Sequence, residues 1–132
     1  MFEINTSANF EAAHRLSSYA GKCKQLHGHN FKVELQMKSS ELDKNEFVYD
    51  FTNLKKILAE FDHKTLLKDN SENKELVKSF PLEWVVWLAF EPTAEQLAKY
   101  ICNKISSQTK LDFIKITIWE NEKSSASFEI KK

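Results

Sequence analysis

The sequence predicts an α+β fold in which a four-stranded antiparallel sheet carries two helices packed on one face. Three observations support this prediction. Apolar and polar residues alternate near both ends of the chain, helical periodicity lies between them, and two glycines and two prolines leave few sharp breaks in 132 residues. Since each strand is apolar on one side only, we expect an antiparallel sheet with the helices covering that side.

Two strands are predicted in the first part of the chain. In residues 2–12, apolar side chains share one parity, which is typical of a half-buried strand. A second strand is predicted from about residue 30 to 38, and its apolar face carries Phe31, Val33, Leu35 and Met37.

Two helices are predicted in the middle of the chain. The first lies near Thr52, and its apolar positions fall at helical spacing in Leu54, Ile57, Leu58 and Phe61. The second begins at Thr93, which is an expected N-cap with Gln96 as its capping-box partner. Leu97, Ile101 and Ile105 give the second helix an apolar stripe.

The last two strands are predicted at residues 114–118 and 126–130, joined by a polar turn at 121–125. Residues 70–92 leave alternatives open. Residues 72–79 fit a short helix, whereas residues 82–90 are apolar on both faces and fit either a helix or an extended segment. Tryptophans at 84 and 87 favour packing or a subunit interface over a ligand platform.

The composition narrows the class of protein. A chain of 132 residues with 42% apolar residues is expected to form one domain, residues 1–132. Nineteen basic and nineteen acidic residues balance, so charge gives no reason to propose a nucleic acid or an anionic membrane as partner. No signal-peptide pattern or membrane span is predicted, and two distant cysteines fit reduced thiols, so a cytoplasmic location is expected.

Three of the four histidines have the spacing of metal ligands. His14 ends an apolar stretch, and His27 and His29 flank Gly28. Their parity places all three on the apolar face of the first two strands, although Gly28 weakens that argument for His27. Three neutral imidazoles without a fourth protein ligand are typical of a catalytic zinc site with an open position.

Other polar residues lie where chemistry would use them. Cys23 lies four residues before His27, and three interpretations are open: a thiolate base near a metal, a fourth zinc ligand or a buried thiol. The thiolate base is the preferred interpretation. Asp62 beside His63 fits a proton-transfer pair or simply the end of the first helix. Glu120 shares the parity of the neighbouring apolar strand, so it fits an acceptor for an N–C–N edge as well as a surface ion pair.

Together these motifs resemble the 6-pyruvoyl-tetrahydropterin synthase family over nearly the whole chain. The resemblance rests on residues 10–16 (FEAAHRL), 23–30 (CKQLHGHN), 50–51 (DF), 61–63 (FDH), 92–95 (PTAE) and 119–120 (WE). The three-residue gap between Cys23 and His27 is similar to the bacterial branch, 6-carboxy-5,6,7,8-tetrahydropterin synthase, of the 7-deazaguanine (queuosine) pathway. A folate-making branch has glutamate in place of this cysteine.

The resemblance implies a role for each matching residue. His14, His27 and His29 would hold Zn²⁺, Cys23 would be the general base, and Asp62 and His63 would form a proton relay. Glu120 would anchor the pterin ring, with Thr93 assisting. The implied reaction converts 7,8-dihydroneopterin triphosphate to 6-carboxy-5,6,7,8-tetrahydropterin, acetaldehyde and triphosphate.

The implied fold is the tunnelling fold, assembled as a homohexamer of two trimers with active sites between subunits. Alternatives are a 6-pyruvoyl-tetrahydropterin synthase, a lyase acting on dihydroneopterin and a non-catalytic zinc- or pterin-binding protein. Residues 63–92 form a longer and more aromatic segment than in compact bacterial members, so they are expected to reshape a pocket wall or an interface. Arg15, Lys24 and lysines of a neighbouring subunit are open candidates for binding the triphosphate.

Overall fold

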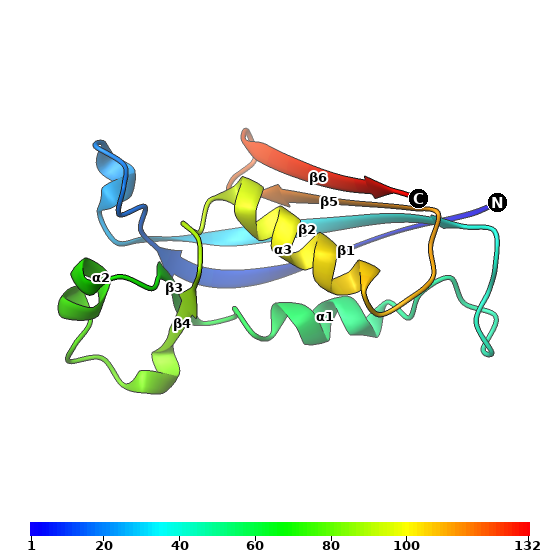
Figure 1. Ribbon diagram of the computed structural model, residues 1–132. Coiled ribbons are helices and arrows are strands. Elements are labelled where there is room, and N and C mark those ends of the chain that lie inside the picture. The colour runs from blue at the N-terminus through cyan, green and yellow to red at the C-terminus, as the bar shows by residue number, and fades with distance from the viewer.

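The computed structural model describes residues 1–132, which form one six-stranded sheet and three α-helices (Figure 1). The strands are β1 (Phe2–His14), β2 (His27–Ser39), β3 (Lys64–Lys68), β4 (Val85–Leu88), β5 (Phe113–Trp119) and β6 (Ser125–Lys131). The helices are α1 (Thr52–Leu58), α2 (Ser71–Leu76) and α3 (Ala94–Ser106), with short 3₁₀ turns η1 (Lys22–Lys24) and η2 (Leu82–Trp84).

The four predicted strands are β1, β2, β5 and β6, and they pair antiparallel as neighbours. The predicted α+β class is confirmed, but the four-stranded antiparallel sheet with two helices is wrong, because the sheet is mixed with six strands and there are three α-helices. β3 pairs parallel to β1, β4 pairs parallel to β3, and the strand order is β4-β3-β1-β2-β5-β6. β3 was not predicted because it shows no alternation of apolar and polar residues. Thr65, Leu66 and Leu67 are all buried, so neither face of the strand is polar.

Both longer helices cover the same face of the sheet, as predicted (Figure 1). α1 contacts β1, whereas α3 contacts β5 and β6. Beneath them Phe10 stacks on Phe31 with ring centroids 4.8 Å apart, and Phe61 packs against Phe10. The alternating strands therefore form one core with the helices, and their other face stays polar.

Residues 69–92 build the end of the sheet beyond β1. Asn70 caps α2 by accepting a hydrogen bond from Asn73 N, and α2 lies close to β3 and β4 at one end of the molecule (Figure 1). Trp84 and Trp87 are both partly exposed, although the Trp84 ring packs edge-on against Phe80, and the interface role stays a prediction. No helix of the structure has both the length and the apolar character to cross a membrane.

Candidate metal centre and active site

The structure brings the three predicted metal-binding histidines together where β1 ends and β2 begins. His14 is directly opposite His27 in the antiparallel register, and His29 is opposite Ala12. Their ligand-capable nitrogen atoms all lie within 4.8 Å of one another. Gly28 pairs with Ala13 in an unbroken ladder, so it causes no shift of register.

Hydrogen bonds to the backbone determine which ring nitrogens are free. His14 Nδ1 lies 2.8 Å from Pro92 O, and His27 Nδ1 lies 2.7 Å from Gln25 O. A carbonyl oxygen only accepts, so each Nδ1 carries a proton and each Nε2 of a neutral ring presents a lone pair. The two Nε2 atoms face each other at 3.1 Å.

Two facing lone pairs repel unless a cation lies between them. Tetrahedral Zn²⁺ with ordinary Zn–N distances would hold two imidazole nitrogens roughly 3.3 Å apart. The observed spacing and the Nδ1 hydrogen bonds therefore fit a metal ion held by His14, His27 and His29.

Burial keeps the site in its metal-binding protonation state. Burial lowers the pKa of His14 to about 4, despite the opposing hydrogen bond to Pro92 O. Burial also lowers the pKa of His29, and the nearby Glu120 carboxylate partly opposes that change. Both rings are thus neutral near pH 7, as metal coordination requires.

Cys23 lies in η1, in the loop that connects β1 to β2, and its side chain is exposed. Its sulfur atom does not belong to the group of ligand atoms around the three histidines. The loop is closed at its base, because Leu16 N donates to Cys23 O over 2.8 Å. The exposed side chain is therefore not a buried thiol, and its absence from the ligand group argues against a fourth ligand.

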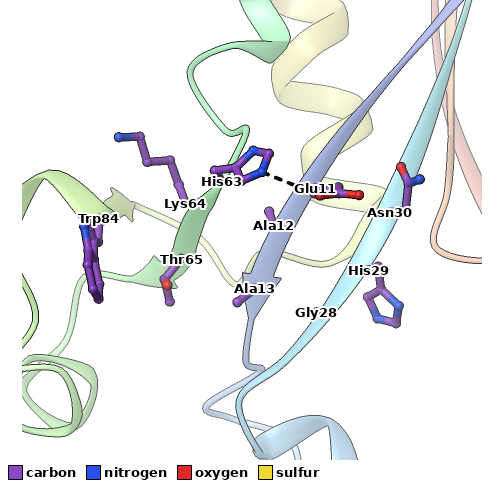
Figure 2. Close-up of a pocket in the computed structure, with 10 residues that line it drawn as sticks. All are labelled: Glu11, Ala12, Ala13, Gly28, His29, Asn30, His63, Lys64, Thr65 and Trp84. Carbon is purple, nitrogen blue, oxygen red and sulfur yellow. Dashed lines mark ion pairs between the residues drawn. The ribbon is translucent and has the colours of Figure 1, made fainter.

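Asp62 and His63 both contact Glu11 of β1. His63 Nδ1 lies 3.0 Å from Asp62 Oδ2. His63 Nε2 lies 3.6 Å from Glu11 Oε2, the ion pair that Figure 2 marks with a dashed line. The backbone reinforces this contact, since Glu11 N donates to Asp62 Oδ1 and His63 N donates to Glu11 O. The hydrogen bonds from Glu11 N and His63 hold the pKa of Asp62 below its usual value.

His63 has a left-handed backbone conformation, with a φ of 59°. That conformation is uncommon outside glycine and requires support from the surroundings. The short hydrogen bond of 2.6 Å from His63 N to Glu11 O supplies this support. The turn therefore directs the imidazole toward Glu11 and away from the helices.

The histidine cluster and the Asp62–His63 pair lie on opposite faces of the sheet. Paired residues share a face, so Ala12 and His29 lie on the helix-covered side and Glu11 and Asn30 on the other. His63 contacts the Glu11 side chain and borders an open depression of about 470 Å³ on that other face (Figure 2). The residues lining this depression also include His29, so it reaches the edge of the histidine cluster.

Glu120 follows β5 directly and continues the parity of Ile114, Ile116 and Ile118, so it lies on the histidine side. Its carboxylate is close enough to raise the pKa of His29 electrostatically. Thr93 caps α3, since its Oγ1 accepts from Gln96 N at 3.1 Å, and it follows the Pro92 carbonyl that His14 contacts. The structure thus gathers Glu120 and the N-terminus of α3 around the histidine cluster.

A family model described as 6-pyruvoyl tetrahydropterin synthase matches residues 3–131. The chain belongs to the 6-pyruvoyl tetrahydropterin synthase family. Two relatives named 6-carboxy-5,6,7,8-tetrahydropterin synthase match along nearly their whole length. The Haemophilus influenzae protein is 28% identical over 98% of this chain and 99% of its own, and the Aquifex aeolicus protein is 27% identical over 97% and 98%.

Solved structures of this family share the fold. The Plasmodium vivax 6-pyruvoyltetrahydropterin synthase superposes with a TM-score of 0.75 at 20% identity, covering 99% of this chain and 98% of that chain. The Caenorhabditis elegans 6-pyruvoyl tetrahydropterin synthase superposes with a TM-score of 0.63 and covers 98% and 96%. The mixed sheet with its helices is therefore the fold of a 6-pyruvoyl tetrahydropterin synthase family member.

Several residues that contact the histidine cluster or the Asp62–His63 pair were not predicted from the sequence. Gln25 and Pro92 contribute only backbone carbonyls, so their side chains carry no signal for that role. Glu11 is simply one of the polar positions on the exposed face of β1. Its contact with His63 depends on the parallel pairing of β1 with β3, which the sequence pattern did not reveal.

The structure also narrows the candidates for binding the triphosphate. The Arg15 side chain is only 7% exposed, and its N–H groups donate to Lys24 O, Asn73 and Glu72. Because the side chain is buried and three of its N–H groups already donate to protein acceptors, Arg15 is the less accessible candidate for binding a phosphate. Lys24 is half exposed and its Nζ lies 3.8 Å from Glu72 Oε1, so it is the more accessible of the two candidates for binding the triphosphate.

Proposed function

We propose that this protein is a zinc-dependent 6-carboxy-5,6,7,8-tetrahydropterin synthase. It would convert 7,8-dihydroneopterin triphosphate and one water molecule to 6-carboxy-5,6,7,8-tetrahydropterin, acetaldehyde and triphosphate in 7-deazaguanine (queuosine) biosynthesis. The observation that carries the proposal is the convergence of His14, His27 and His29 in a chain whose full-length relatives bear that name.

The three imidazoles would hold the zinc ion through nitrogen atoms that face a common point. When bound, zinc polarises hydroxyl groups of the substrate side chain and makes them more acidic. The Nδ1 hydrogen bonds of His14 and His27 fix the ring orientation, and burial of His14 excludes water from one side.

Cys23 would act as the general base that removes a proton from the pterin side chain. Cys23 lies in the loop that leads into His27, and its sulfur is not among the grouped ligand atoms, which supports a base rather than a ligand. A thiolate suits this role because it accepts a proton from the substrate directly.

Asp62 and His63 would return protons to the substrate. Asp62 accepts from His63 Nδ1, so Nε2 is the nitrogen left to exchange a proton. Because this pair lies on the opposite face of the sheet from the histidine cluster, the pair that serves a given zinc site would come from a neighbouring copy. This geometry supports a shared active site in a homohexamer built from single-domain chains of residues 1–132.

Glu120 would anchor the pterin ring. A carboxylate next to an apolar face needs donors, and the pterin 2-amino group and ring N–H present two in parallel. Thr93 would assist through its position beside Pro92, although its hydroxyl also caps α3. We expect the reaction to take place in the cytoplasm, where the free Cys23 and Cys102 stay reduced.

The test is to incubate purified zinc-loaded protein with 7,8-dihydroneopterin triphosphate and to identify the products. The proposal requires 6-carboxytetrahydropterin together with one acetaldehyde per triphosphate released. Pyruvoyl-tetrahydropterin without acetaldehyde would instead assign the triphosphate-elimination reaction. His29→Ala is the matched control, because it should lose both zinc and turnover, and a metal-free wild-type protein with full activity would refute the metal role.

A further inference from the structure

We infer that Arg15 is a positioning residue that holds the Cys23 loop against the segment containing α2. The inference rests on the proposed role of Cys23 as the general base. Arg15 directly follows His14, the last residue of β1. Its side chain reaches Lys24, near the other end of the loop that connects β1 to β2.

The contacts of Arg15 join three separate parts of the chain. Its Nε donates to Lys24 O at 2.8 Å, next to Cys23 in η1. One terminal nitrogen donates to Asn73 Oδ1, and the other lies 3.0 Å from Glu72 Oε1. The guanidinium fork therefore connects the loop backbone to α2 through three different acceptors.

Burial makes the Arg15–Asn73 contact the strongest part of this connection. Asn73 is completely buried, and its Nδ2 also donates to Lys68 O at the end of β3. The position of Asn73 is thus held by the sheet itself. A buried cation that loses a hydrogen-bond acceptor is costly, so Arg15 and Asn73 strongly favour one arrangement. The Glu72 side chain is half exposed and contributes less.

A second connection holds the beginning of the same loop. Ser17 N donates to Glu91 Oε2 at 2.9 Å, the Ser17 hydroxyl donates to Glu91 Oε1, and Asn70 Nδ2 donates to Ser17 Oγ. Together with the Leu16 N to Cys23 O hydrogen bond, these contacts fix both ends of the loop. Residues 69–92 therefore form the support on which the Cys23 loop rests.

The conservative variant Arg15→Lys separates positioning from phosphate binding. Lysine keeps the positive charge, which largely suffices for a phosphate, but it cannot bridge three acceptors in fork geometry. We expect zinc content to stay unchanged, kcat to fall at least about tenfold through misplacement of the base, and KM to change by less than about twofold. Hydrogen–deuterium exchange of residues 16–25 should rise, with exchange of β5 unchanged.

Asn73→Ser is a second variant that reaches the same contact from the other side, and it should give the same pattern of changes. Lys78→Ala is the matched control, since Lys78 pairs with Glu75 on the exposed surface of the same segment and touches nothing in the loop.

A raised KM with intact kcat and unchanged loop exchange in Arg15→Lys would overturn the inference in favour of phosphate binding. Unchanged exchange in both variants would also overturn it. If the wild-type protein does not turn over the substrate, the proposed function fails, and exchange still decides whether Arg15 fixes the loop.

Discussion

His14 shows how a single residue connects burial to metal binding. The ring is 1% exposed, and its pKa is lowered to about 4 because burial penalises the charged imidazolium. The same burial that strengthens the core around Phe10 and Phe31 therefore keeps His14 ready for a cation at neutral pH.

The first prediction concerns the pH dependence of the metal-free protein. A pKa lowered from 6.5 to about 4 means that the unfolded chain binds more protons than the folded chain between these values. Stability should therefore rise with pH through this window, with a contribution from His14 approaching about 1.4 kcal/mol per pH unit. Chemical denaturation at several pH values should show a shallower slope for His14→Gln. Parallel slopes for variant and wild type would contradict the prediction.

The second prediction distinguishes a base from a ligand at Cys23. Cys23→Ala should keep one zinc per chain and the fold, yet lose turnover by at least about a hundredfold, because a general base typically contributes that much. Metal analysis, circular dichroism and product assays measure the three quantities. Cys102→Ala is the control for thiol loss, since Cys102 is buried in α3 far from this chemistry. Loss of zinc from Cys23→Ala would identify Cys23 as a ligand.

The third prediction tests the anchor proposed for the pterin. Glu120→Gln keeps the shape of the side chain but replaces one acceptor oxygen with a donor that opposes a pterin N–H. We expect substrate binding to weaken by on the order of 2 kcal/mol, with zinc content unchanged. Titration calorimetry with the inactive Cys23→Ala protein would measure this change. Glu122→Gln, an exposed carboxylate in the same turn, is the matched control, and equal affinities for both proteins would argue against the anchor.

At the scale of elements, the beginning of α3 serves stability and the site together. The Thr93 hydroxyl oxygen accepts a hydrogen bond from Gln96 N. The carbonyl of the preceding Pro92 accepts one from His14 Nδ1 and so orients that ring. α3 also buries Leu97, Ile101 and Ile105 against the sheet, so a change in its start position would shift the carbonyl that His14 uses.

The fourth prediction follows from this cap. Thr93→Ala should lower the free energy of unfolding by about 1 kcal/mol, and Thr93→Ser should restore most of it because serine keeps the capping oxygen. Urea denaturation measures both values. If Thr93 also assists the substrate, Thr93→Ala should raise KM while Thr93→Ser does not. Equal stability of the alanine and serine variants would contradict the capping role.

At the scale of the whole molecule, the two faces of the sheet divide the proposed chemistry. The histidine cluster and Glu120 lie on the helix-covered side, whereas His63 and Glu11 lie on the other. A sheet is one residue thick, but side chains on its two faces point apart. We therefore expect a second copy of the chain to complete the active site.

The fifth prediction is recovery of activity by mixing two inactive variants. His29→Ala keeps the Asp62–His63 pair, and His63→Ala keeps the metal site. Subunits mixed randomly at equal amounts should regain about one quarter of the wild-type activity, because half of the sites have an intact metal centre and half of those have an intact neighbour. The mixture is unfolded and refolded together, and each variant treated alone is the control. No recovery in a mixed oligomer would show that each chain builds its own site.

The sequence by itself determined those features that depend on local pattern. Strand alternation predicted β1, β2, β5 and β6, and it placed His14, His27, His29 and Glu120 on the face that the structure shows. The Thr93 cap was predicted for the same reason, since a cap and its partner are three residues apart. These predictions succeed because period and parity are set by the backbone geometry of a single element.

Only the tertiary structure decided the features that depend on contacts between distant segments. β3 and β4 are short and have no polar face of their own, so their parallel pairing with β1 is defined only when the chain is folded. The carbonyl that orients His14 comes from Pro92, 78 positions further along, and the acceptor for Arg15 comes from Asn73, 58 positions further along. Contacts of this kind leave no periodic signal, because each one depends on how whole elements pack rather than on the spacing of residues within an element.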